Sequence, residues 1–180
     1  MSSSYRRFEH MVVELKGEIV KHLGEVLMGF KNVVVSGNEG VGKLKYTLAA
    51  FESEKNLYYI GNPFDYEGKA RPQGYDEYVR QVKALKADMH VIIKEGDILS
   101  LDLSTLSNSE AVVVIDEMYG RCPTQCEKLL GILVDDTVRV AVITGCLRNL
   151  GVVCESLDKG VLLTTTGLLV IEQDFLKKMC

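Results

Sequence analysis

The sequence predicts an α/β fold, a three-layer sandwich in which helices cover both faces of a mainly parallel sheet. Three short runs rich in β-branched residues support this prediction, because such runs are typical of strands buried on both faces. The runs end at Ser36, Ile115 and Ile143, and helix-length stretches separate them. Parallel strands need long, right-handed crossovers, so we expect the three strands to end at one edge of the sheet.

The first third of the chain predicts a helix followed by two strands with a helix between them. Apolar residues recur at helical intervals from about residue 8 to residue 28, which predicts an amphipathic N-terminal helix packed beside the sheet. These residues are Phe8, Val12, Leu15, Ile19, Leu23 and Val26. A strand over 32–36, a helix over 42–54 and a strand over 57–60 are expected next. Residues 61–74 are rich in Gly, Pro and charged residues, which predicts a loop.

The rest of the chain continues the alternation of helices and strands. Asp76 to Ala87 reads as a helix, and two short apolar runs over 90–93 and 98–103 suggest either a strand pair or a strand and a turn. Pro123 is placed to open a helix that extends to about Val134, because proline fits the first helical turn. The remaining predicted elements are strands over 111–115 and 138–143, a short helix over 147–157, and a final pair over 161–164 and 168–171.

Composition predicts one compact domain that spans residues 1–180. The chain has 180 residues and is 47% apolar, which is enough to bury a sizeable core. Its 21 basic and 25 acidic residues give a net charge of −4, so charge does not support nucleic acid or an anionic membrane as a partner. No run of about 18 apolar residues and no cleavable leader is apparent, and we therefore expect a cytoplasmic protein without a membrane span.

Five cysteines occur in the chain, at positions 122, 126, 146, 154 and 180. A cytosolic setting favours reduced thiols, whereas disulfides would be credible in a protein from a hyperthermophile. An alternative is a four-thiolate zinc site, because Cys122 and Cys126 would share a helical face and Cys146 and Cys154 could complete the set. Neither pair has C-x₂-C spacing, and free cysteine packs readily as a small core residue, so we favour reduced thiols without metal.

A glycine-rich segment follows the first predicted strand directly. It reads Gly37-Asn38-Glu39-Gly40-Val41-Gly42-Lys43. Glycines permit positive φ angles, so successive N–H groups can turn inward around a phosphate. A helix beginning near Lys43 would add its N-terminal dipole, and the ammonium could reach the β- and γ-phosphates. The segment resembles a P-loop, or Walker A motif, with one departure: Leu44 stands where the motif has the Ser or Thr whose hydroxyl binds Mg²⁺.

The second buried run ends in two acids, Asp116 and Glu117. This pair resembles a Walker B element followed by a glutamate. An aspartate at the carboxyl end of a parallel strand can hold magnesium directly or through water, and the next carboxylate can polarise an attacking water. An exposed pair of solvated carboxylates is the simpler alternative, but the upstream loop favours the functional interpretation.

From about Met11 to Ile171 the chain resembles the additional-strand P-loop ATPases, the AAA+ and RecA-like group. The loop, the acidic pair and a polar residue at the next strand tip, Thr144, occur in the expected order. The resemblance implies that Thr144 contacts the γ-phosphate or the attacking water, and that the Walker B strand lies beside the loop strand. It also implies an arginine finger, for which Arg148 is our first choice and Arg121 and Arg139 are alternatives.

Two functions follow from this resemblance. The first is an ATPase, oligomeric or coupled to a protein partner, in which residues 37–44 bind ATP or ADP, Asp116 organises Mg²⁺, and Glu117, Thr144 and Arg148 act in hydrolysis. The second is a nucleotide-binding regulatory or structural module that does not hydrolyse. Leu44 favours the second function and the acidic pair favours the first. Thr47 does not replace the missing hydroxyl, because it lies about 4.5 Å further along the helix axis.

Overall fold

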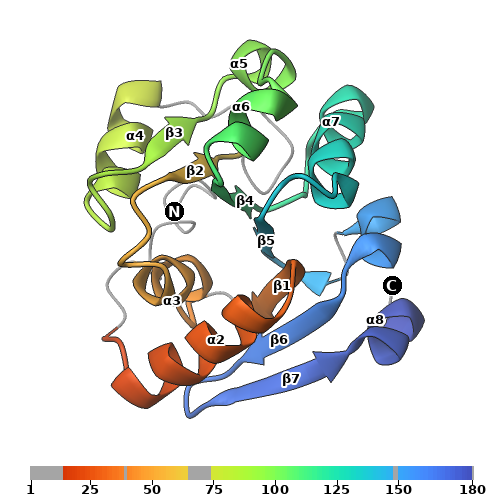
Figure 1. Ribbon diagram of the computed structural model, residues 1–180. Helices are drawn as coiled ribbons and strands as arrows, with labels where there is room; N and C mark the ends of the chain where they lie inside the picture. The colour runs from red at the N-terminus through yellow and green to blue at the C-terminus, as the bar shows by residue number, and fades with distance from the viewer. Residues whose placement is uncertain (1–13, 39, 65–73, 148–149, 180) are drawn as a thin grey trace.

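The computed structural model describes residues 14–38, 40–64, 74–147 and 150–179. Within these ranges seven strands form one sheet in the order β3-β2-β4-β5-β1-β6-β7 (Figure 1). All neighbouring strands are parallel except β6 and β7, which are antiparallel. The strands are β1 (Asn32–Gly37), β2 (Leu57–Ile60), β3 (His90–Ile92), β4 (Val112–Asp116), β5 (Val140–Thr144), β6 (Lys159–Leu163) and β7 (Leu168–Glu172). The prediction of an α/β fold with a mainly parallel sheet is confirmed.

Helices pack against both faces of the sheet (Figure 1). Side chains alternate along β1, so that Val33 and Val35 join one hydrophobic core and Val34 joins the other. The first core also receives α2 (Gly17–Gly29), α3 (Lys43–Ala50) and α4 (Tyr75–Lys83). The second receives α5 (Glu95–Leu99), α6 (Leu103–Asn108), α7 (Pro123–Val134), the 3₁₀ helix η3 (Gly151–Ser156) and α8 (Gln173–Met179).

The N-terminal amphipathic pattern corresponds to α2 from Gly17 onward. Residues 14–16 are not helical, so the predicted helix is wrong there, and residues 8–13 lie outside the described ranges. Ile19, Leu23 and Val26 are buried, as their spacing predicts. They lie in the same core as Leu44 and Leu48 of α3, so α2 covers the helix that follows the glycine-rich loop.

One predicted strand is wrong. Residues 98–103 are not extended, because the segment forms the end of α5 and the beginning of α6. Alternating leucines at 99, 101 and 103 imitate a strand pattern. The side chain of Asp102 accepts a hydrogen bond from the Ser104 N–H at 3.0 Å and caps α6, a local signal that favours a helix. Helix α8 was also absent from the predicted elements.

The strand order corrects a second prediction. The Walker B-like strand β4 does not lie directly beside β1, because β5 lies between them and pairs with both. All five residues of β5 are buried, which fits a central position in the sheet. The register aligns Val35, Thr144 and Asp116 across β1, β5 and β4. The ends of three strands far apart in sequence therefore meet at the carboxyl edge.

Two further expectations concern cysteines and membranes. Cys122, Cys126 and Cys146 are free, but Cys154 is disulfide-bonded, so the prediction of reduced thiols is wrong at Cys154. The described residues contain no cluster of three or more metal-ligating side chains, so the zinc alternative gains no support. Across the same ranges no helix has both the length and the apolarity needed to cross a bilayer.

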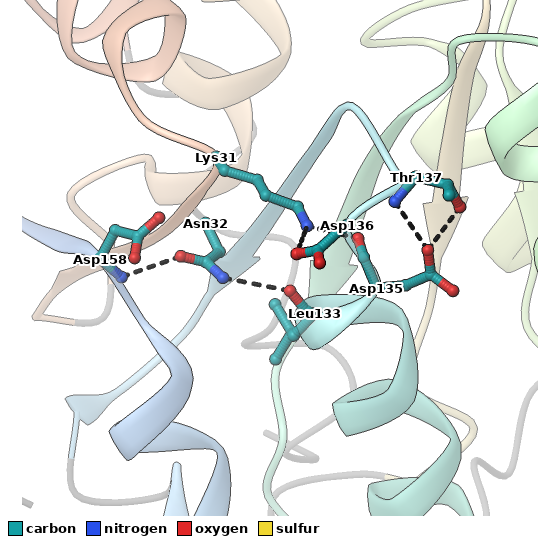
Figure 2. Close-up of polar contacts among 7 residues, drawn as sticks. All are labelled: Lys31, Asn32, Leu133, Asp135, Asp136, Thr137 and Asp158. Carbon is teal, nitrogen blue, oxygen red and sulfur yellow. Dashed lines mark hydrogen bonds and ion pairs between the residues drawn. The ribbon is translucent and has the colours of Figure 1, made fainter.

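Asn32 ties together three segments at the amino edge of the sheet, opposite the glycine-rich loop. Its side-chain amide donates to the carbonyl of Leu133 at the end of α7 (3.1 Å), and its side-chain oxygen accepts from the Asp158 N–H (2.9 Å) (Figure 2). The neighbouring Lys31 forms an ion pair of 3.6 Å with the fully exposed Asp136. Asn32 is 6% exposed, so loss of its amide would leave a buried carbonyl without its donor.

We predict that Asn32→Ala lowers the free energy of unfolding by about 1–3 kcal/mol, the usual cost of an unpaired buried polar group. Urea denaturation measures this change. Asp136→Ala is the matched control, because an exposed ion pair contributes only about 0–1 kcal/mol. Equal stability of the Asn32→Ala variant and the parent would contradict the role of Asn32.

Candidate functional site

The glycine-rich loop joins β1 to α3 in a turn that needs glycine. A Cβ at Gly37 would lie 2.6 Å from the carbonyl oxygen of Leu163 and 2.8 Å from the Val41 side chain, so no side chain fits there. Gly40 (φ 85°) and Gly42 (φ 91°) have positive φ angles that other residues rarely adopt. Of the other predicted loop residues, Asn38 is exposed, Val41 is buried, and Glu39 lies outside the described residues.

Lys43 is the first residue of α3, and its side chain turns back over the loop. Its ammonium donates to the carbonyl oxygen of Gly37 at 3.0 Å. The positive charge is therefore held against the glycine-rich turn, beside the N-terminus of α3, where the first N–H groups of a helix have no partner within the helix itself. Both features favour an anion at this position.

The two residues that bear on metal binding are buried in helix α3. Leu44 is 1% exposed and belongs to the core shared with α2. Thr47 is 0% exposed, and its hydroxyl donates to the carbonyl of Lys43 at 2.8 Å. The prediction that Thr47 does not replace the missing hydroxyl agrees with this bond, because its proton is already donated to the helix backbone.

Asp116 ends β4, and hydroxyl groups hold both of its carboxylate oxygens. Tyr59 donates to Oδ2 at 2.5 Å, and Thr144 donates to Oδ1 at 3.0 Å. The residue is 7% exposed, so these bonds offset part of the cost of burying its charge. The structure therefore brings Asp116 and Thr144 together at the edge where the loop begins.

Glu117 follows β4 in a left-handed conformation with φ 46°. Its N–H donates to the carbonyl of Thr144 at 2.7 Å, which ties the end of β4 to the tip of β5. Its carboxylate accepts from the Tyr119 N–H at 3.2 Å and lies against Gly145, where a Cβ would come within 3.1 Å of either oxygen. A strained conformation of this kind costs about 1–3 kcal/mol and is common at functional sites.

Thr144 has a different immediate partner from the one the resemblance implies. Its hydroxyl proton is donated to Asp116, so in this arrangement Thr144 has no second proton to donate to a phosphate. The hydroxyl can still accept a hydrogen bond from a water. The main contact of the Thr144 hydroxyl is therefore the hydrogen bond that it donates to Asp116.

The three candidate arginine fingers differ in their placement. Arg121 is 7% exposed and donates to the carbonyls of Asp116 (2.6 Å) and Glu117 (2.9 Å), which joins β4 to the beginning of α7. Arg139 forms an ion pair with Glu54 at 2.6 Å. It directly precedes β5 and therefore lies at the amino edge of the sheet, opposite the site. Both arginines have structural roles. Arg148, the first choice, lies outside the described residues.

Sequence reasoning missed two residues that contact the acidic pair. Tyr59 lies in β2, where its Leu-Tyr-Tyr-Ile context resembles an ordinary buried strand. Asn62 follows β2 and donates to the carbonyls of Glu117 (3.0 Å) and Tyr119 (2.7 Å). The signal for Asn62 was available, because a polar residue just past a predicted parallel strand belongs to the carboxyl edge.

A separate cavity of about 440 Å³ lies between α3 and the residues after α4, and its lining includes Lys45, Leu85 and Lys86. Lys86 is 8% exposed and pairs with Asp88 at 2.9 Å, so its charge is already matched. The lining contains none of residues 37–43. This cavity is therefore distinct from the glycine-rich loop.

Comparisons with known proteins do not assign the chain to a family. No protein-family model matches it, and no curated protein matches it either. The functional interpretation therefore depends on the motifs and on their geometry.

We predict that Gly37→Ala lowers the free energy of unfolding by about 2–4 kcal/mol, because the added Cβ must displace the backbone of β6. Gly40→Ala is the matched comparison, since its Cβ would meet nothing within 4 Å. Its cost is the left-handed conformation alone, about 1–2 kcal/mol. Chemical denaturation of both variants measures the difference, and equal losses would contradict the close packing at Gly37.

Proposed function

We propose that this chain is a cytoplasmic ATP-binding P-loop protein of the additional-strand ATPase group, with slow hydrolysis. One observation carries the proposal: the Lys43 ammonium lies 3.0 Å from the Gly37 carbonyl, over a glycine turn that leads into α3. A phosphate in the turn would meet a lysine charge, a helix N-terminus and backbone N–H groups together. No guanine-selective motif is apparent, which favours ATP or ADP over GTP.

The neighbouring strand ends support the same proposal. Asp116 and Thr144 are aligned with Val35 in the sheet, and the loop begins two residues after Val35. Ligands of open α/β folds bind at the carboxyl ends of the strands. Asp116 and Thr144 therefore lie at the same edge of the sheet as the loop that would bind the phosphate.

The protein groups fit a magnesium ion only in part. Asp116 would hold the ion, directly or through water, and each carboxylate oxygen has capacity for more than one hydrogen bond. When bound, Mg²⁺ would neutralise charge on the β- and γ-phosphates. Leu44 has no oxygen that could bind the ion, and its side chain is buried in the core shared with α2.

A nucleotide-binding module without turnover is the second candidate function, and Leu44 favours it. In that case ATP would bind at the glycine-rich loop without being cleaved. In either case we propose that the nucleotide-bound state acts on a partner protein or on another copy of the chain.

We predict that Lys43→Ala weakens ATP binding about ten- to a hundredfold, because a charge-assisted contact contributes about 1.5–3 kcal/mol. Calorimetric titration with ATP and Mg²⁺ measures the affinity. Lys21→Ala, an exposed lysine on α2, is the charge-matched control and should bind as the parent does. Unchanged binding in Lys43→Ala, or no binding by the folded parent, would overturn the proposal.

We predict that Leu44→Thr lowers the free energy of unfolding by about 2–4 kcal/mol without nucleotide, because it removes buried apolar atoms and adds a buried hydroxyl. The restored hydroxyl should enlarge the rise in melting temperature caused by MgATP. Thermal melts with and without MgATP measure both effects. A MgATP-induced rise equal to that of the parent would contradict a metal role for this position.

Phosphate release from the same proteins separates the two candidate functions. The parent should hydrolyse slowly or not at all, Leu44→Thr should gain turnover, and addition of Glu117→Gln should remove the gain. A fast parental ATPase would contradict the proposed impairment by Leu44.

A further inference from the structure

Tyr59 connects the aspartate of the site to helix α4. Its hydroxyl lies 2.5 Å from Asp116 Oδ2 and 3.0 Å from the hydroxyl of Tyr78. The Tyr78 oxygen also accepts from the Asn62 N–H at 3.2 Å. Tyr59 is 0% exposed and Tyr78 is 4% exposed. A buried chain of hydrogen bonds therefore runs from α4 through β2 to the end of β4.

Hydrogen-bonding capacity sets the direction of this chain. An ionised aspartate only accepts, so the single proton of Tyr59 points to Asp116. Tyr78 must then donate its own proton to the Tyr59 oxygen, while its oxygen accepts from Asn62. Each donor polarises the next, which strengthens the final bond to the carboxylate.

Burial raises the pKa of the Tyr59 phenol well above its usual value, and the charge of Asp116 raises this pKa further. Both effects favour the neutral phenol, which is the form that donates to Oδ2. This bond fixes the carboxylate on one side, while Thr144 fixes the other oxygen at 3.0 Å.

We propose that Tyr59 is the positioning residue that orients Asp116 for a magnesium-bound nucleotide. Two hydroxyl donors, one from each neighbouring strand, prevent rotation of the carboxylate and leave its charge intact. Because position 44 has no Ser or Thr hydroxyl, the metal site then depends on the oriented carboxylate of Asp116 alone. This inference rests on the proposed nucleotide binding and assigns the Mg²⁺-dependent part of the affinity to the Tyr59 contact.

The experiment separates the magnesium-dependent affinity from the rest. Calorimetric titration of ATP into each folded variant is run with Mg²⁺ and again with EDTA. In the parent, Mg²⁺ should tighten binding. Tyr59→Phe should keep the EDTA affinity within about twofold and lose about tenfold of the gain from Mg²⁺. Lys43→Ala should weaken binding in both conditions.

Tyr46→Phe is the matched control for loss of a buried phenol hydroxyl. Tyr46 is 3% exposed, and its hydroxyl accepts from the Lys16 N–H at 3.0 Å rather than meeting the acidic pair. It should bind ATP as the parent does in both conditions. If Tyr59→Phe does not fold, Tyr78→Phe takes its place, with an expected loss of about two- to fivefold confined to the Mg²⁺ condition.

Each contrary result is distinct. An unchanged gain from Mg²⁺ in folded Tyr59→Phe, or in Tyr78→Phe if it is the substitute, overturns the positioning role. Equal losses with and without Mg²⁺ also overturn it, because they indicate a general structural effect. A parent that binds ATP equally in both conditions overturns this inference alone. A parent that binds no ATP in either condition overturns the proposed function and the inference with it.

Discussion

The parallel register of three central strands is the constraint on which the candidate site depends. Val35, Thr144 and Asp116 lie level across β1, β5 and β4, although they are far apart in the chain. This register allows the Thr144 hydroxyl to reach the Asp116 carboxylate and the Glu117 N–H to reach the Thr144 carbonyl. A slip of one residue would turn each of these side chains to the other face of the sheet. The contacts among Thr144, Asp116 and Glu117 therefore depend on strand pairing rather than on the glycine-rich loop.

At position 44, core packing and metal binding favour different side chains. Helix α3 must present its first turn to the loop and also bury a face against α2. Leu44 serves the second need, and its side chain adds to a core that contains Leu23 and Leu27. A hydroxyl there would serve the first need at a cost in buried apolar area. The buried hydroxyl contacts to Asp116 come from β2 and β5 instead, outside the motif.

Local patterns predicted the parts of the site that are continuous in sequence. The glycine loop and the acidic pair each follow a β-branched run, so their place at strand ends could be read directly. Tyr59 and Asp116 are 57 residues apart, and their contact depends on the pairing of β2 with β4. The hydrophobic periodicity of a sequence does not predict which strands pair with each other. The same reason explains why Arg121 was considered as an alternative arginine finger, although it is buried among main-chain carbonyls.

The fold was predicted well where burial dominates and less well where capping decides. Strands β1, β4 and β5 are buried on both faces and were recognised from composition alone. Residues 98–103 failed because alternating leucines suggested a strand, whereas the Asp102 cap and the burial of Ile98 and Leu106 belong to two short helices. Leu44 could be interpreted from sequence as either a degenerate ligand position or a core residue. Only the packing of α2 on α3 decided its burial.

Backbone amide NMR during titration with ATP and Mg²⁺ tests the central claim most directly, because it locates the bound nucleotide. The account predicts that the largest shifts occur at Gly40, Gly42 and Lys43, with shifts at Asp116 that require Mg²⁺. The separate cavity near α3 supplies an internal comparison, since its lining includes Leu85, Lys86 and Asp88. Shifts centred on those three residues, or no shifts at saturating ATP, would contradict nucleotide binding by the glycine-rich loop.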